Sequence, residues 1–267
     1  MTARSAPRPS PHDAYFLDID GTIVAIADSP DDVRAGAQLL RVIRHLKLVT
    51  NGAVALISGR SLADIDRLFP NSGLPAAGQH GEEWRNATGG TRRPRARSAP
   101  LDISRRALTA SMTRHPRLRL EDKGQSLALH YRSAPQLAAT AHRLMRDMLA
   151  LAGRQYVLQR GKRVVELRLA GRDKGDAIAH FMQEPPFLGR TPVFLGDDIT
   201  DETGFRVVNQ LGGHTIKVGP GRTAANWRLA DAQAVVAWLA SGEPAPVAVR
   251  RARERRDRPG TRPRRSS

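Results

Sequence analysis

Two carboxylates stand two residues apart at the end of an apolar segment near the N-terminus. Residues 15–17 are followed by Asp18 and Asp20, and then by the turn residues Gly21 and Thr22. In an extended chain, residues i and i+2 project to the same side, so both carboxylates would face whatever lies beyond the predicted strand. Two close carboxylates repel each other unless a cation or a shared proton holds them. The pair therefore needs partners from elsewhere in the chain; without them it would be an acidic turn on the surface.

Polar groups also stand at the ends of two later apolar strands and at the start of one helix. The predicted strands over 53–57 and 191–195 are each followed by such groups, and the helix opens near residue 172. In open α/β sheets, ligands bind beyond the carboxyl ends of the strands. The groups that would meet the first pair there are Ser58, Lys174, Asp197, Asp198 and Asp201.

This set of side chains is typical of a phosphoryl-transfer site. Carboxylates from two strands offer the hard oxygen ligands that Mg²⁺ prefers. A carboxylate can also attack phosphorus and form an aspartyl-phosphate, while a hydroxyl and an ammonium group bind the other phosphoryl oxygens. Taken singly, Ser58 could be a turn residue, Lys174 a solvated charge and Asp201 a helix cap. Four such segments in this order predict phosphoryl transfer instead.

Strands and helices alternate in the two segments that carry these groups. The alternation predicts an α/β fold with a doubly wound parallel sheet. The continuous apolar run over 53–57 is typical of a strand buried on both faces, and Ser61 with Asp64 predicts a capping box for the next helix. The predicted strands are 15–17, 53–57, 74–77, 191–195 and 214–218, and the predicted helices are 30–48, 61–68, 172–182 and 232–239.

The pattern changes between residues 86 and 168. Residues 86–100 predict a loop or a short polar hairpin, and the alternation that follows predicts two antiparallel hairpins, each preceded by a helix. The hairpins span 117–132 and 156–169. We therefore expect a core formed by 14–85 and 169–242, an inserted α+β cap over 86–168, and disordered tails over 1–13 and 243–267.

Charged residues in the inserted unit form two pairs, each sharing a predicted strand face: Glu121 with Lys123, and Lys162 with Glu166. Such a mixed-charge face can donate hydrogen bonds to hydroxyl groups and accept them; the alternative is an exposed, salt-bridged sheet face. The chain has only five lysines, at positions 47, 123, 162, 174 and 217, among 43 basic residues. Each lysine is therefore a candidate for a place where a compact ammonium group is required.

Composition excludes several classes of protein. The chain has no cysteine, which excludes disulfides, thiolate metal sites and cysteine nucleophiles. No apolar segment is long enough to span a bilayer, so we expect a cytoplasmic protein without a membrane partner. The net charge of +17 suggests nucleic acid, but nine arginines over residues 247–267, against Glu254 and Asp257, supply +7 of it. That tail has no interleaved aromatic residues and no base-reading motif, so we expect no specific nucleic-acid partner.

The motifs resemble those of the haloacid dehalogenase-like (HAD) phosphatases. The resemblance rests on the segment 18–22, on Ser58, on Lys174 and on the acidic segment 196–201. The inserted unit resembles the C2-type cap of that superfamily. Within the superfamily, the chain is similar over residues 14–240 to bacterial trehalose-6-phosphate phosphatases. The stretches that carry this similarity are Leu56–Ser61, Gly78–Gly81, Glu121–Gly124, Ala128–Arg132, Val164–Glu166 and Thr191–Asp198.

The resemblance implies catalytic and metal-binding roles. It makes Asp18 the nucleophile, and Asp20 the general acid and base. Ser58 and Lys174 would hold the phosphoryl group. The implied cofactor is Mg²⁺, bound by Asp18, Asp197 and the main-chain carbonyl of Asp20.

The resemblance also implies supporting and substrate-binding residues. Asp198 and Asp201 would support the metal site, and cap residues would bind sugar hydroxyls. The implied substrate-binding residues are Asp18, Ile19, Asp20, Glu121, Lys123, Arg132, Lys162 and Glu166.

From the sequence we expect the first of the following functions, with the other two as alternatives. The first is Mg²⁺-dependent hydrolysis of trehalose 6-phosphate by a monomer that acts after a trehalose-6-phosphate synthase. The second is hydrolysis of another sugar phosphate, such as sucrose 6-phosphate, by a related capped phosphatase. The third is a nucleic-acid-binding or regulatory protein that acts through its arginine-rich tail.

Overall fold

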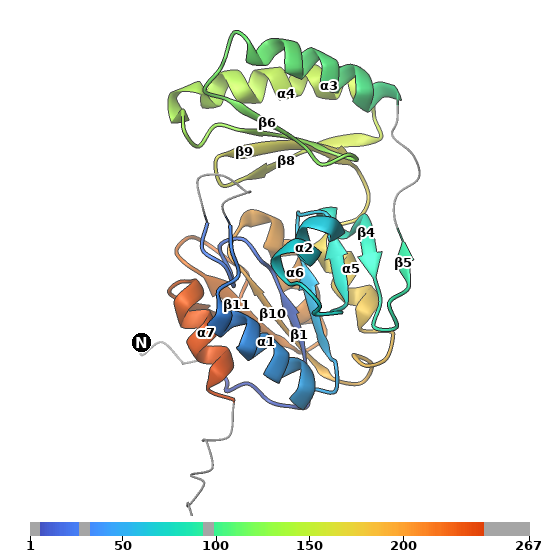
Figure 1. Cartoon of the computed structure of the whole chain (residues 1–267), viewed down its shortest axis with the longest axis vertical. Helices are drawn as coiled ribbons and strands as arrows, with labels where there is room; N and C mark the ends of the chain where they lie inside the picture. Colours follow the sequence, from blue (N-terminus) through green and yellow to red (C-terminus); the bar gives the residue numbers. More distant parts are fainter. Residues whose placement is uncertain (1–5, 27–32, 93–98, 243–267) are drawn as a thin grey trace, which may run out of the picture.

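Eight strands form one sheet at the centre of the larger of two stacked units (Figure 1). The computed structural model describes residues 6–26, 33–92 and 99–242. The strand order is β12-β11-β10-β1-β2-β3-β4-β5, parallel from β12 to β3 and antiparallel beyond it. The strands are β1 Asp13–Leu17, β2 Val54–Ile57, β3 Ala76–Gly78, β4 Glu83–Arg85, β5 Thr91–Arg92, β10 Thr191–Gly196, β11 His214–Val218 and β12 Trp227–Leu229.

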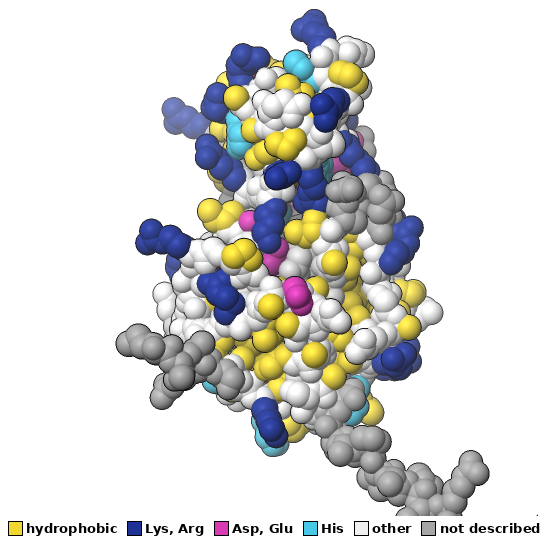
Figure 2. Space-filling view, turned by 90° about the vertical axis from the view of Figure 1, so that its left-hand side faces the viewer, with side chains coloured by type: hydrophobic (Ala, Val, Ile, Leu, Met, Phe, Trp, Pro, Cys, Tyr) yellow, Lys and Arg dark blue, Asp and Glu magenta, His cyan; other side chains and the backbone are white. Residues whose placement is uncertain are grey.

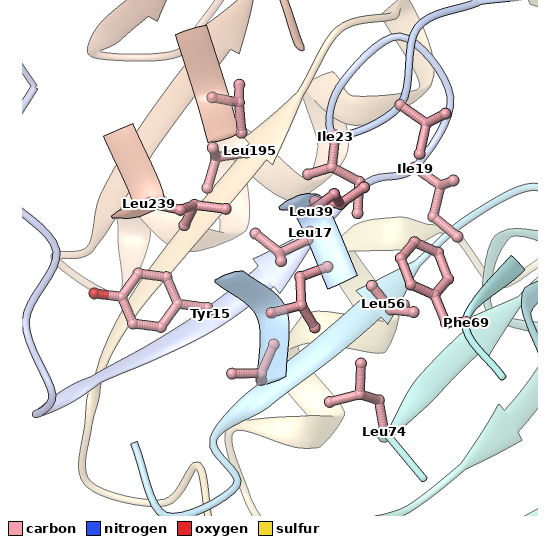
Figure 3. Packing of buried hydrophobic residues seen from close by; sticks show 14 of the residues in the cluster. Tyr15, Leu17, Ile19, Ile23, Leu39, Leu56, Phe69, Leu74, Leu195 and Leu239 are labelled. Carbon is pink, nitrogen blue, oxygen red and sulfur yellow. The ribbon is translucent and has the colours of Figure 1, made fainter. Parts of the chain in front are cut away.

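Both faces of this sheet are covered by helices, which is why β1 and β2 are continuous apolar runs. Tyr15 and Leu17 of β1 point into the hydrophobic cluster beneath α1 and α7 (Figure 3). Ala14 and Phe16 point into a second cluster beneath α5 and α6. The helices are α1 Ala37–Val49, α2 Leu62–Leu68, α5 Lys174–Phe181, α6 Glu202–Gln210 and α7 Ala232–Ala240. The predicted α/β fold with a doubly wound parallel sheet is thereby confirmed.

The smaller unit is an antiparallel sheet covered on one face by two helices, with the other face turned toward the core (Figure 1). Its strand order is β6-β7-β9-β8, and Leu127, Leu129, Val165 and Leu167 pack beneath the helices. On the opposite face, Glu121, Ala128, Glu166 and Gln159 form one cross-strand row. The elements are α3 Ala99–Met112, β6 Arg119–Asp122, β7 Leu127–His130, α4 Ala138–Ala152, β8 Tyr156–Gly161 and β9 Val164–Leu169. We call this unit the cap.

The helices and strands differ from the sequence prediction in several places. Helix α1 begins at Ala37, after the N-cap residue Gly36, and residues 30–32 of the predicted helix lie outside the described residues. The hairpin of β4 and β5 extends the core sheet to residue 92, so the expected boundary at 85/86 falls inside it. Strand β12 was not predicted, because three residues carry too little alternation to indicate a strand. Ser61 caps helix α2 by accepting a hydrogen bond from the main-chain N–H of Asp64, which is one half of the predicted capping box; the Asp64 carboxylate accepts from the Ser61 hydroxyl instead of from its main-chain N–H.

The N-terminal segment before β1 is held against the core, which corrects the expectation of disorder through residue 13. The hydroxyl of Tyr15 accepts a hydrogen bond from the N–H of Ser10 at 2.6 Å and donates one to its carbonyl at 2.9 Å. Trp238 donates to the carbonyl of Pro7 at 2.9 Å. The predicted C-terminal tail, 243–267, lies outside the described residues.

Among residues 6–26, 33–92 and 99–242, no helix combines the length and the apolar character needed to cross a bilayer.

Replacing Tyr15 with phenylalanine tests whether the N-terminal segment is anchored. The ring would still fill the core, but the two hydrogen bonds to Ser10 would be lost, so we expect the free energy of unfolding to fall by about 1 kcal/mol. Urea denaturation followed by far-UV circular dichroism measures this. An unchanged midpoint and an unchanged slope would contradict the anchored segment.

Candidate active site

The carboxyl ends of three neighbouring strands bring together the side chains that the sequence singled out. Asp18 follows β1, Ser58 follows β2 and Asp197 follows β10, and β1 pairs with both of the other strands. Each of these residues is at most 4% exposed. Polar groups buried this completely require hydrogen-bonding or charged partners.

Lys174 supplies the partner for two of the buried carboxylates. Its ammonium group donates to Oδ1 of Asp18 at 2.7 Å and to Oδ1 of Asp201 at 2.6 Å. Burial lowers the pKa of Lys174, but the two carboxylates outweigh burial and raise it above its ordinary value, so the group stays charged. The N-cap residue Asp173 and its capping-box partner Asp176 start helix α5 at this point and so fix where the lysine leaves the backbone.

Asp18 is bonded at both oxygens. Its Oδ2 accepts a hydrogen bond from the hydroxyl of Thr22 at 2.7 Å, while Oδ1 accepts from Lys174. Burial, with the nearby charges of Asp201 and Asp197, nevertheless raises the pKa of Asp18 well above its usual range. A carboxylate in this setting is fully ionised only when more positive charge is close to it.

The arrangement fits a hard cation. Carboxylate oxygens of Asp18, Asp197 and Asp201 all lie within 4.8 Å of one another. Asp201 is engaged elsewhere, because its Oδ2 accepts the main-chain N–H groups of Asp197 and Asp198 at 2.9 and 2.8 Å. Gly21 leaves open the space beside Asp197, since a Cβ there would overlap that carboxylate. Oxygen donors around a space of this kind suit a small divalent cation.

Asp20 is turned away from Asp18, toward Arg60. The guanidinium group of Arg60 donates from Nε and Nη2 to the two carboxylate oxygens of Asp20, both at 2.7 Å. The Asp20 side chain remains 38% exposed, whereas that of Asp18 is 6% exposed. Asp18 and Asp20 thus occupy different environments. Asp18 is buried beside an ammonium group, and Asp20 is partly exposed and paired with a guanidinium group.

One pocket lies between the core and the cap and contains both sets of predicted residues. Figure 2 shows acidic side chains at the narrow level where the two units meet, with Lys and Arg side chains above them. The predicted residues that line the pocket are Asp18, Asp20, Ser58, Lys174, Asp197 and Asp198 from the core, and Glu121, Lys123, Arg132, Lys162 and Glu166 from the cap.

The cap reaches the core through two lysines. Lys162 donates from its ammonium group to Oδ2 of Asp197, and from its main-chain N–H to Oδ2 of Asp198 at 3.2 Å. Lys123 donates to the main-chain carbonyl of Gly59 at 3.1 Å. Both contacts join a cap side chain to a loop at the carboxyl edge of the core sheet.

Glu166 is the most enclosed carboxylate of the cap. It is 5% exposed and accepts hydrogen bonds from Lys123 at 2.9 Å and from the hydroxyl of Ser126 at 2.5 Å. Although burial raises its pKa, these partners outweigh burial and hold the pKa of Glu166 well below its usual range. Glu121, further along the same row, contacts His130 at 2.7 Å.

Two predicted residues take positions other than those expected. The side chain of Ile19 is fully buried in the core cluster, so only its main chain could contact a substrate. Lys162 does not share a strand face with Glu166, because it lies in the tight turn between β8 and β9, next to Arg163 with φ of 61°. That turn position carries its side chain further toward the core than a strand position would.

Sequence reasoning missed several residues of the site. Arg60 and His80 fall within stretches that carry the family resemblance, but no role followed from their spacing. No sequence feature pointed to Gln159. Lys217 could have been found, because it is one of only five lysines. Its buried ammonium group donates to the carbonyls of Asp197 and Val218.

Lys217→Met tests this buried lysine. The methionine fills a similar volume but leaves the carbonyl groups of Asp197 and Val218 without their donor, so we expect the free energy of unfolding to fall by about 2 kcal/mol. Lys47→Met is the matched control: its half-buried ammonium group donates to the carbonyl of Ser72, away from the pocket. The control should lose less than about 1 kcal/mol. Equal losses in urea denaturation would show that Lys217 has no special structural role.

Comparison with known proteins agrees with this geometry. A family model of trehalose-phosphatase matches residues 16–233. The chain is 46% identical over 227 residues to trehalose-6-phosphate phosphatase of Escherichia coli (strain K12), covering 85% of each chain. It is 42% identical over 207 residues to a probable trehalose-phosphate phosphatase of Sinorhizobium fredii, covering 78% of each. The C-terminal domain of the C. albicans trehalose-6-phosphate phosphatase superimposes with a TM-score of 0.76 at 20% identity, over 85% of this chain and 90% of that one, which supports the fold alone. On the length of the family match and the identity to these relatives, this chain belongs to the trehalose-phosphatase family.

Proposed function

We propose that the protein hydrolyses trehalose 6-phosphate to trehalose and phosphate in a Mg²⁺-dependent reaction that passes through an aspartyl-phosphate. The observation that carries the proposal is the shared pocket: the nucleophile candidate Asp18 and the polar face of the cap line the same space. A phosphate ester could therefore lie on the core while its sugar lies against the cap.

The first half of the reaction forms a bond between Asp18 and phosphorus. A carboxylate oxygen of Asp18 attacks the phosphoryl group, and the bond from phosphorus to the sugar oxygen breaks. Asp20, protonated for this step, gives its proton to the leaving sugar oxygen. Lys174 and the hydroxyl of Ser58 donate hydrogen bonds to phosphoryl oxygens as charge moves onto them.

The second half releases phosphate. Asp20, now ionised, accepts a proton from a water molecule, and the oxygen of that water attacks phosphorus. The bond between phosphorus and Asp18 breaks, which restores the carboxylate of Asp18 and leaves Asp20 protonated for the next cycle. Before the first half, Arg60 must loosen its hold on Asp20, because a bidentate guanidinium group favours the ionised carboxylate.

Mg²⁺ would be held by Asp18, Asp197 and the main-chain carbonyl of Asp20, with Asp198 and Asp201 fixing that loop. Bound there, it would supply positive charge that offsets repulsion between the carboxylates and polarises the phosphoryl group. Lys162 contacts Asp197 through its ammonium group. With a divalent cation bound to that carboxylate, this lysine would be free to contact the substrate.

The cap supplies the preference for a sugar. Glu121 and Glu166 can accept hydrogen bonds from sugar hydroxyls, and Lys123, Arg132 and Lys162 can donate them. Such a set of donors and acceptors suits a polyhydroxylated ligand. Closure of the cap would exclude bulk water from the phosphoryl group. The E. coli relative is a trehalose-6-phosphate phosphatase by name, which favours this substrate over sucrose 6-phosphate. The substrate would come from a trehalose-6-phosphate synthase, and the protein would act as a monomer.

A panel of sugar phosphates tests the substrate. We expect phosphate release from trehalose 6-phosphate to exceed that from sucrose 6-phosphate and glucose 6-phosphate by about a hundredfold, because glucose 6-phosphate lacks the second sugar and sucrose 6-phosphate places its hydroxyl groups differently against the cap. Release should fall to background after treatment with a chelator and return when Mg²⁺ is added. Equal or faster release from another sugar phosphate would replace the proposed substrate.

Asp18→Asn tests the covalent step. The amide is a poor nucleophile, so we expect kcat to fall by about four orders of magnitude or more. Asp66→Asn, which changes a half-exposed carboxylate bonded to Arg85, serves as the control and should retain wild-type activity. Residual activity of the Asp18 variant that cannot be traced by mass spectrometry to deamidation would count against an aspartyl-phosphate.

A further inference from the structure

The turn after β3 holds two consecutive non-glycine residues in the left-handed region of the backbone. Gln79 has φ of 45° and His80 has φ of 58°, and both side chains are buried. Each such residue costs on the order of 1 kcal/mol, so surrounding contacts must hold the turn in place. The main-chain N–H groups do this: that of Gln79 donates to the carbonyl of Arg60 at 2.8 Å, and that of His80 to the carbonyl of Ser58 at 3.0 Å.

This backbone directs the imidazole of His80 out of the core sheet and against the loop that carries Ser58. A Cβ at Gly59 would lie 2.6 Å from Nε2 of His80, so the ring needs a glycine there. The carbonyl of the same glycine accepts the hydrogen bond from Lys123 of the cap. His80 thus occupies the seam where core and cap meet.

On the cap side, the imidazole contacts Glu166 and Gln159, two residues of the cross-strand row. Nε2 of His80 lies 3.5 Å from Oε2 of Glu166, and the amide nitrogen of Gln159 lies 3.2 Å from Nδ1 and 3.0 Å from Nε2. Burial lowers the pKa of His80, so the neutral ring has one nitrogen that donates and one that accepts. In the tautomer that carries its proton on Nε2, this nitrogen faces the carboxylate and Nδ1 accepts from the amide.

The amide of Gln159 is itself oriented by Arg168. Nε of Arg168 donates to Oε1 of Gln159 at 2.5 Å, which turns the amide nitrogen toward the imidazole. Nη1 of Arg168 donates to the carbonyl of Arg172 at 2.9 Å, in the segment that leads from the cap into helix α5. Hydrogen bonds therefore run from the connection between cap and core through Arg168 and Gln159 to His80, whose Nε2 in turn lies 3.5 Å from Oε2 of Glu166.

We propose that His80 is a positioning residue that orients Glu166 and Gln159 for the sugar when the cap is closed. The inference rests on the proposed function, because it takes Glu166 to bind the sugar. His80 lies at the wall of the same pocket and acts through the carboxylate and the amide that it contacts. Its loss should therefore weaken recognition of the sugar more than it slows transfer of the phosphoryl group.

His80→Asn tests this with little change to the backbone, because asparagine also tolerates a positive φ but is too short to reach Glu166 and Gln159. We expect KM for trehalose 6-phosphate to rise about tenfold while kcat changes by less than about threefold. With p-nitrophenyl phosphate, which has no sugar, kcat/KM should change much less. The ratio of the two kcat/KM values should therefore fall about tenfold.

Two further variants separate positioning from a general structural effect. Gln79→Asn changes the neighbouring left-handed residue, whose amide donates to Glu83 within the core at 2.8 Å, and should leave the ratio within about threefold of wild type. Gln159→Ala should lower the ratio as His80→Asn does, and the double variant should lose no more than the larger single loss, because both act through one network. If His80→Asn folds poorly, Gln159→Ala still tests the same network.

Three outcomes would overturn the proposal. They are a ratio unchanged in His80→Asn, an equal loss on both substrates, and additive losses in the double variant. Failure of the proposed function itself would be visible in the wild type, as faster release from another sugar phosphate; the ratio is then measured with that substrate, and the same outcomes decide the role of His80.

Discussion

Asp18, Asp197 and Asp201 bring carboxylate oxygens within 4.8 Å of one another beneath the carboxyl edge of the sheet, where little solvent reaches them. Burial of a single unpaired carboxylate is costly, and three together add mutual repulsion. The ammonium group of Lys174 offsets much of this, because it bonds Asp18 and Asp201 at once. Asp201 in turn accepts two main-chain N–H groups of the loop after β10. One buried cation thereby fixes β1, β10 and helix α5 relative to one another.

The negative charge that Lys174 does not offset determines which charged groups the cap must supply. A phosphate ester is itself anionic, so an acidic pocket would repel it unless cations accompany it. Lys123 and Lys162 enter from the cap, and Lys162 reaches Asp197 directly. The cap therefore adds positive charge beside the carboxylates of the core. The core holds the buried carboxylate of Asp18, and the balance of charge around it depends on both units.

Periodicity and spacing were enough to predict the core sheet, the inserted cap and the strand-end carboxylates. Each of these is indicated by residue patterns that lie within single strands, helices or their ends. Arg60 and Asp20 show what such patterns omit. They are 40 residues apart and meet only because β1 pairs with β2, so neither residue signals the other. Lys162 shows a second limit: the alternating pattern continued past the strand into a turn, where side chains no longer follow a period of two. The N-terminal segment shows a third, since its anchors, Tyr15 and Trp238, lie outside it.

The contacts between core and cap explain why the core keeps a strained backbone at Gln79 and His80. A regular turn after β3 would relieve it, but the imidazole would then no longer lie between Gly59 and Glu166. The free energy stored in two left-handed residues is small beside that of the buried contacts that hold them, so the fold tolerates it. Because those contacts come from both units, the cap is held over the core by the same side chains that face the sugar. On the proposed function, a substrate that engages Glu166 and Lys123 would therefore act on the contacts between cap and core as well as on its own binding.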